Sequence, residues 1–250
     1  MTPGHAELVA ELEAIAGPLS ASRRGNDSSG GSGRPFYGAP VPDRRRIVRG
    51  YLRRTPDMSA VLATIESLVD GVSHDERTLA ALILGASPKV RALSGVGDLE
   101  RWLDKVNGWA EVDSLTANVF KAEEMAAGWP SWRRLIERLA ADPNPNKRRA
   151  ALVLLTGPTR SSEDPRFAGL ALEIIERLQG ERSILITKAV SWLLRSMCGR
   201  HQALVTDYLG RAGPSLPAIA ARETRTKLAT GTKSGRSASR PRLGASADAP

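Results

Sequence analysis

The sequence has 250 residues, 41% of them hydrophobic and only 4% aromatic, which supplies a sizeable core and favours helices over sheets. Its 36 Lys and Arg residues outnumber 27 Asp and Glu residues, and the net charge of +9 favours polyanionic partners such as nucleic acid. A single cysteine excludes an internal disulfide framework. The sequence contains no apolar run of 18 residues, so no transmembrane helix is predicted. We therefore expect a cytoplasmic, nucleoid-associated protein that binds no membrane.

The N-terminal part predicts one short helix followed by a loop. Leu8, Leu12 and Ile15 recur at helical spacing. Three glutamates interrupt the apolar positions, so residues 1–17 predict an amphipathic helix rather than a signal peptide. Residues 18–34 then break the pattern, and their Gly, Ser and Arg content predicts a flexible basic loop.

Helical periodicity then continues to residue 228. Pro42 opens a helix that reaches about Arg54, and Met58 begins the apolar stripe of the next. Ser73 and Glu76 have the spacing of a capping box. Further helices are expected near residues 98–107, 110–125, 130–141, 145–156, 165–178, 182–197, 201–211 and 214–228. Short joins between many helices predict stacked antiparallel pairs, so the fold we expect is all-α, a HEAT-like solenoid with a concave basic face.

The last segment loses the apolar period. Residues 229–250 are rich in Ser, Gly, Ala and Arg, which predicts a disordered basic tail. Residues 35–228 therefore form the predicted folded domain, between the flexible loop and this tail.

Most sequence signatures of metal and cofactor sites are missing. His5, His74 and His201 lie far apart, and Cys198 has no CxxC partner, so we expect no metal site. There is no phosphate-binding loop, no convincing dinucleotide fingerprint and no nucleophile elbow, so we expect no cofactor.

Two segments place charged residues at suggestive positions on predicted helices. Trp109 and Asp113 are four residues apart, which puts an indole and a carboxylate on one helix face. Lys147, Arg148 and Arg149 stand at the start of an apolar helix. Basic side chains there oppose the helix dipole unless an anion such as a phosphate neutralises them.

A third segment carries Lys188, Trp192 and Arg195 on one helix face. Each of the three segments alone has an ordinary explanation: a tryptophan that packs in the core, or a solvated charged face. Their combination and order are more specific than the parts.

In this order the segments resemble the DNA alkylation-repair family of HEAT-like glycosylases. That family carries an aromatic-Gly segment leading into a Pro-x-x-Arg helix start, which matches residues 35–45, PFYGAPVPDRR. It then has a Trp-x-x-x-Asp helix, an Arg before a small-residue helix, and a Lys-Ala-x-x-Trp-x-x-Arg helix. The resemblance covers roughly residues 35–228.

The resemblance implies a role for each matching residue. Asp113 falls on the catalytic carboxylate, Trp109 and Trp192 fall on the two indoles that face the lesion, and Arg149 falls on the arginine that binds the DNA backbone. Arg148 takes that place if the match shifts by one residue. Further DNA contacts are expected from the neighbouring basic residues Lys147, Lys188, Arg195, Arg44 and Arg45.

This resemblance predicts a monomeric glycosylase that hydrolyses the N-glycosidic bond of cationic N3- or N7-alkylated purines in double-stranded DNA. The chemistry fits the residues, because a cationic base is a good leaving group and Asp113 can stabilise the sugar cation and hold a water. The alternative is a non-catalytic HEAT-like scaffold that binds nucleic acid or protein. It explains the charge and fold equally well, but not the match at Trp109, Asp113, Arg149 and Trp192.

Overall fold

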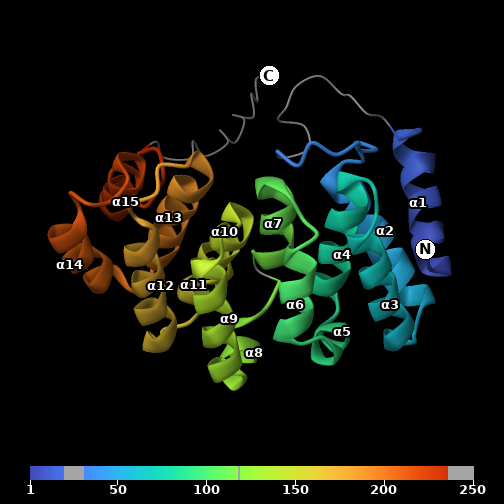
Figure 1. Cartoon of the computed structure of the whole chain (residues 1–250), viewed down its shortest axis with the longest axis horizontal. Coiled ribbons are helices and arrows are strands. Elements are labelled where there is room, and N and C mark those ends of the chain that lie inside the picture. The colour runs from blue at the N-terminus through green and yellow to red at the C-terminus, as the bar shows by residue number, and fades with distance from the viewer. Residues whose placement is uncertain (20–30, 118, 236–250) are drawn as a thin grey trace, which may run out of the picture.

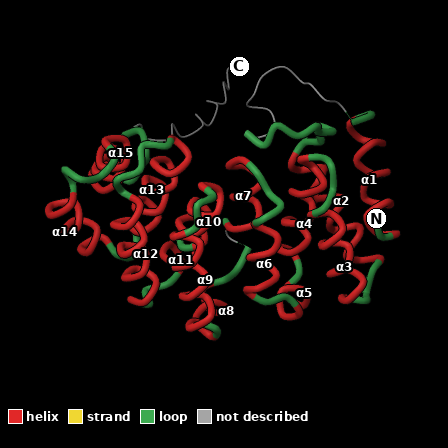
Figure 2. The backbone as a smooth tube through the Cα atoms, viewed as in Figure 1, coloured by secondary structure: helices red, strands yellow, loops and turns green. Residues whose placement is uncertain are grey.

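The computed structural model describes residues 1–19, 31–117 and 119–235, which form helices α1 to α15 and contain no β-strand (Figures 1 and 2). The all-α prediction is therefore confirmed. The helices are α1 (Pro3–Ala16), α2 (Val41–Arg54), α3 (Met58–Val69), α4 (His74–Ala86), α5 (Pro88–Leu93), α6 (Val96–Leu103), α7 (Gly108–Thr116), α8 (Ala122–Ala127), α9 (Trp129–Ala141), α10 (Pro145–Leu154), α11 (Thr156–Ser161), α12 (Pro165–Leu178), α13 (Ile184–Met197), α14 (Gln202–Ala212) and α15 (Ala218–Thr230).

The predicted loop and tail fall largely outside the described residues, at 20–30 and 236–250. Residues 31–40 are described; they precede α2 and contain no helix. The helix expected to end near residue 228 continues to Thr230. Leu8 and Leu12 of α1 are fully buried in the same core as the rest of the chain, so α1 is part of the folded unit.

Local sequence signals start several helices where they were expected. The capping box of α4 is present: the Ser73 amide donates to Glu76 Oε2 at 2.7 Å, and the Glu76 amide donates to Ser73 Oγ at 3.1 Å. Proline occupies the first turn of α2, α9, α10 and α12, where its missing N–H has no intrahelical acceptor to lose.

The prediction of a single helix at residues 110–125 is wrong. The chain leaves the helix after Thr116 and resumes as α8 at Ala122. Between them Val119 and Phe120 are buried, and the Phe120 ring lies 4.7 Å from that of Trp132. Burial of these two side chains outweighs the helix propensity of the intervening residues, a tertiary effect that periodicity alone does not show.

The helices form antiparallel pairs that stack into two layers. The pairs are α3–α4, α6–α7, α9–α10, α12–α13 and α14–α15. The second helix of each pair packs against the second helix of the next, so α4, α7, α10, α13 and α15 follow one another across the molecule (Figure 1). This is the stacked architecture of a helical repeat protein.

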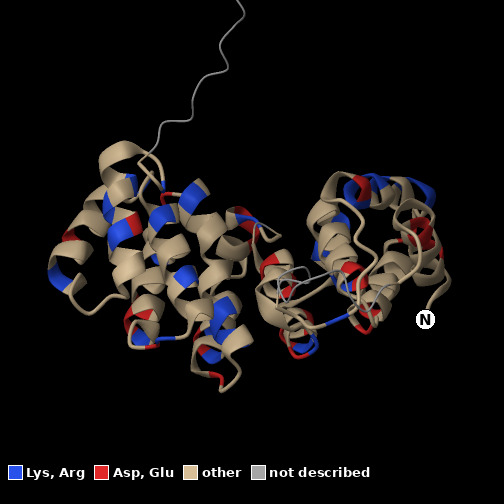
Figure 3. Cartoon of the chain, turned by 90° about the horizontal axis from the view of Figure 1, so that it is seen from above, with Lys and Arg blue, Asp and Glu red and all other residues tan. Residues whose placement is uncertain are grey.

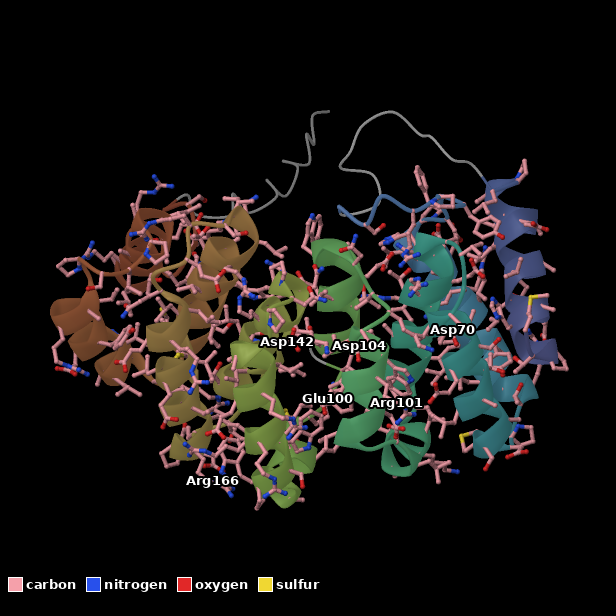
Figure 4. The ribbon with its side chains drawn as sticks, in the orientation of Figure 1. Asp70, Glu100, Arg101, Asp104, Asp142 and Arg166 are labelled. Atoms are coloured by element: carbon pink, nitrogen blue, oxygen red, sulfur yellow. The ribbon has the colours of Figure 1, made fainter. Side chains whose placement is uncertain are left out.

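A recurring carboxylate marks the repeat where the sequence shows no fixed period. Asp70, Asp104 and Asp142 are the C-cap residues of α3, α6 and α9, and they lie in a row across the molecule (Figure 4). Lysines neutralise them: Lys105 pairs with Asp70, and Lys147 pairs with both Asp104 and Asp142. A cation relieves the repulsion between a carboxylate and the negative C-terminal end of a helix.

Candidate active site

Helix α7 presents an exposed indole. Trp109 is 49% exposed, and it is the one exposed tryptophan among the five in the chain, all of which the structure describes. It follows Gly108, whose φ of +72° lies in the left-handed region that favours glycine. Asp113 follows one turn later on the same face and is partly buried. A large indole left in solvent beside a sheltered carboxylate is a pattern of binding sites rather than of cores.

A guanidinium holds the Asp113 carboxylate at both oxygens. Arg149 Nε donates to Asp113 Oδ1 at 2.8 Å, and Arg149 Nη2 donates to Oδ2 at 2.7 Å. Arg149 Nη1 donates to the main-chain oxygen of Leu185 at 2.6 Å. Arg149 lies on α10, so this one buried side chain connects α7, α10 and α13. The planar fork of arginine suits this bidentate geometry, which fixes the orientation of the carboxylate.

The electrostatic environment of Asp113 combines two opposing effects. Burial raises the pKa of this carboxyl above its ordinary value, while the hydrogen bonds and the charge of Arg149 act to lower it. The two hydrogen bonds from the positively charged guanidinium favour the ionised form of Asp113. The site therefore holds a sheltered negative charge of fixed orientation.

Helix α13 supplies the second indole. Trp192 is partly buried and packs against the core. Leu185, Lys188 and Trp192 are spaced three and four residues apart, so they share one stripe of α13. The contact of Arg149 with the main-chain oxygen of Leu185 joins the first turn of α13 to the Asp113 pair. Lys188 is exposed.

The other basic residues of α10 pair with carboxylates of the protein. Arg148 donates to both oxygens of Glu181, at 2.6 and 3.1 Å, and to the carbonyls of Asp142 and Pro143. Lys147 is the residue that pairs with Asp104 and Asp142. The anions that neutralise the start of this helix are therefore side chains, where the sequence suggested a phosphate. Arg149, and not Arg148, is the residue that faces Asp113.

The remaining predicted DNA contacts fall into two groups. Two arginines have intramolecular partners: Arg195 lies 3.4 Å from Glu223, and Arg44 contacts Asp75 at 3.9 Å as well as Thr78. Burial lowers the pKa of Arg44.

Arg45 and Lys188 form the second group, because both are exposed and neither has an ion-pair partner among the described residues. Arg49, one turn after Arg45, joins it at a cavity of about 450 Å³ that α2 forms with α4 and α7. Arg49 is not among the residues predicted from the sequence. Lys and Arg as a whole are spread along the array of helices and are interspersed with Asp and Glu (Figure 3).

The described residues contain no cluster of three or more His, Cys, Asp or Glu side chains placed to hold a metal ion. Within the same residues, no helix has the length and apolar character needed to cross a membrane.

Fold and site together define a class: a helical repeat protein with an oriented carboxylate on one inner helix and an exposed indole one turn before it. The sequence profile of DNA alkylation repair enzymes matches residues 8–228, and the chain belongs to that family. The match begins well before residue 35, so it includes most of α1.

Among solved structures, the fold is similar to that of a predicted DNA alkylation repair enzyme from Enterococcus faecalis. The TM-score is 0.64 at 18% sequence identity, and the alignment covers 84% of this chain and 99% of the other. No curated protein matches the sequence.

Proposed function

We propose that the chain is a DNA glycosylase that releases cationic N3- or N7-alkylated purines from double-stranded DNA. The observation that carries this proposal is the Asp113 carboxylate, sheltered and held at both oxygens by Arg149, on the helix that exposes Trp109. Membership of the DNA alkylation repair family supports a role in DNA repair.

The proposed reaction is hydrolysis at the sugar carbon C1′. The glycosidic C1′–N bond breaks, and its electron pair goes to the ring nitrogen, which neutralises the cationic base as it leaves. The sugar becomes an oxocarbenium-like cation, and a water oxygen bonds to C1′ while its proton passes to Asp113 or to solvent. Asp113 acts by stabilising the developing positive charge and by holding the water, and its charge is already oriented before the reaction begins.

Arg149 has a positioning role in this proposal. It is only 5% exposed, and its fork is committed to Asp113 and to Leu185. The resemblance predicts that Arg149 binds the DNA backbone, whereas its contacts with Asp113 and Leu185 favour orientation of Asp113. The permanent charge of Arg149 also keeps Asp113 ionised as water is excluded from the site.

The two indoles provide a preference for positive charge. An aromatic face attracts a cation by about 0.5–2 kcal/mol, depending on how completely the pair is desolvated. Trp109 is exposed and can cover an alkylated base, and Trp192 lies on α13, the helix whose first turn Arg149 contacts. Arg45 and Lys188 are exposed and bind phosphates of the duplex in this proposal.

Lesion selectivity tests this proposal. The purified chain is given duplexes that carry 3-methyladenine, 7-methylguanine or uracil, and released base is measured. The two cationic bases are released and uracil is not, because Asp113 is held as an anion by Arg149 and has no histidine partner among the described residues, so it does not protonate a neutral base. Tight DNA binding without release of any base would instead support the non-catalytic scaffold.

A further inference from the structure

A second carboxylate of α7 is buried on the opposite side from Asp113. Glu111 is only 1% exposed, and three polar groups lie against its carboxylate. The Asn107 amide donates to Oε2 at 2.9 Å, His74 Nδ1 lies 3.3 Å from Oε1, and Arg34 Nε lies 3.5 Å from Oε2. Glu111 therefore caps the first turn of α7, the turn that carries Trp109, and joins it to α4 and to the segment before α2.

That segment, residues 31–40, is held along its length. The Asn107 side chain donates to the Ser32 carbonyl at 3.3 Å, and Arg34 donates to the Lys105 carbonyl at 3.1 Å. Further along, the His74 amide donates to the Pro35 carbonyl at 2.9 Å. The segment thus crosses from α4 to the loop that leads into α7.

The same segment reaches the exposed indole. A methyl group placed on Gly31 would lie 3.8 Å from Cδ1 of Trp109, which is van der Waals contact. Gly31 therefore lies next to the Trp109 ring, which is otherwise half exposed to solvent. The anchors of residues 31–34 at that point are the Ser32 contact with Asn107 and the ion pair of Arg34 with Glu111.

We propose that Glu111 is a positioning residue of the glycosylase site, and that the segment 31–34 it holds forms one wall of the pocket for the alkylated base. The proposal rests on the function proposed above and deepens it. Glu111 does not touch the base. It sets the start of α7 and the segment 31–34 relative to each other, and thereby fixes the face that Trp109 presents.

The proposed role of Glu111 depends on the ion pair that its buried carboxylate makes with Arg34. A buried carboxylate persists when it is paired and hydrogen-bonded, and Glu111 meets both conditions through Arg34 and Asn107. In Glu111→Gln the shape and the cap acceptor remain, but the charge that attracts Arg34 is lost. The segment then loses an anchor, and Trp109 loses the fixed position of its neighbour Gly31.

Glu76, which lies 35 residues before Glu111, provides a matched control. Glu76 is also buried, also caps a helix by accepting the N-cap amide, of Ser73 at 2.7 Å, and also pairs with a histidine, His5, at 2.8 Å. It serves α4, and no contact links it to Trp109. Glu76→Gln therefore reproduces the loss of a buried charge, but its own contacts are with Ser73 and His5 and not with Glu111, Arg34 or Trp109.

The experiment compares Glu111→Gln, Arg34→Ala and Glu76→Gln in the full chain, using a duplex with 7-methylguanine. Glu111→Gln and Arg34→Ala slow base release at saturating DNA by about tenfold, with KM little changed, because misplacement of a binding group acts on the reacting geometry. The double variant is no slower than Glu111→Gln, since both changes break one connection. Glu76→Gln releases base at the wild-type rate.

A fluorine spectrum of the chain labelled with 5-fluorotryptophan gives a readout that needs no activity. The five tryptophans give five resonances, and Trp109→Phe identifies the one of interest. This resonance shifts in Glu111→Gln and in Arg34→Ala but not in Glu76→Gln. Arg34 is on a partly exposed segment, so its variant serves if Glu111→Gln does not fold.

Two results would overturn the inference: base release by Glu111→Gln that falls no further than in Glu76→Gln, or a Trp109 resonance that does not move in Glu111→Gln and Arg34→Ala. If the wild-type chain releases no alkylated base, the proposed function fails, and the fluorine spectra alone then decide whether Glu111 positions Trp109.

Discussion

Removal of Arg149 is the perturbation whose consequences follow most directly from the structure. In Arg149→Met the Asp113 carboxylate loses both of its guanidinium hydrogen bonds, and the Leu185 carbonyl loses its donor. Breaking a buried ion pair from one side costs about 3–5 kcal/mol. The side chains here are 7% and 16% exposed, so the lower end applies, about 3 kcal/mol.

This loss is measured by thermal unfolding followed by circular dichroism at pH 7. For a domain of this size 1 kcal/mol corresponds to roughly 2–4 °C, so Arg149→Met lowers Tm by about 6–12 °C. The matched control is Arg148→Met, the adjacent residue, whose pair with Glu181 is more exposed and whose loss costs about 1 kcal/mol.

A second control removes both charges. In the double variant Asp113→Asn with Arg149→Met no unpaired carboxylate is left, so the double variant is more stable than the sum of the single changes predicts. An Arg149→Met protein that unfolds no earlier than Arg148→Met would refute the structural role given to the Asp113–Arg149 pair.

Three other predictions follow from the same geometry. Burial raises the pKa of Asp113, and the reaction needs the Asp113 anion, so base release declines on acidification at a higher pH than it would for an ordinary aspartate. Arg149→Met moves the pH of this decline further upward. A pH–rate profile of both proteins measures the two values. Duplex binding weakens steeply with salt in fluorescence anisotropy, and Arg45→Ala and Lys188→Ala each reduce the log–log salt slope by about one; an unchanged slope would exclude those residues as phosphate contacts. Gly108→Ala places a side chain at a φ of +72° and costs about 1–2 kcal/mol in urea unfolding, whereas no loss would mean that α7 begins differently.

The sequence predicts the parts of this molecule that local interactions determine. The capping box of Ser73 and Glu76 and the first-turn prolines start helices where they were expected. The break at Val119 and Phe120 is not predictable in this way, because it depends on the packing of Phe120 against Trp132.

The candidate site, too, is predictable from the sequence only where its interactions are local. The i, i+4 spacing of Trp109 and Asp113 predicts that they share a face of one helix. The partners of Arg148, Arg149 and Lys147 lie between 5 and 43 residues away on other helices and loops, so charge alone suggested phosphates for them. Glu111 gives no local signal, since its role depends on residues from three separate segments.

The most direct test of the central claim compares base release by wild-type protein and by Asp113→Asn. A methylated duplex is the substrate, and Asp207→Asn, an exposed aspartate on α14, is the control. Asp113→Asn keeps its affinity for the duplex but releases 3-methyladenine and 7-methylguanine at least about a hundredfold more slowly, because the carboxylate acts mainly on the transition state. Release by Asp113→Asn at the wild-type rate would contradict a catalytic role for Asp113.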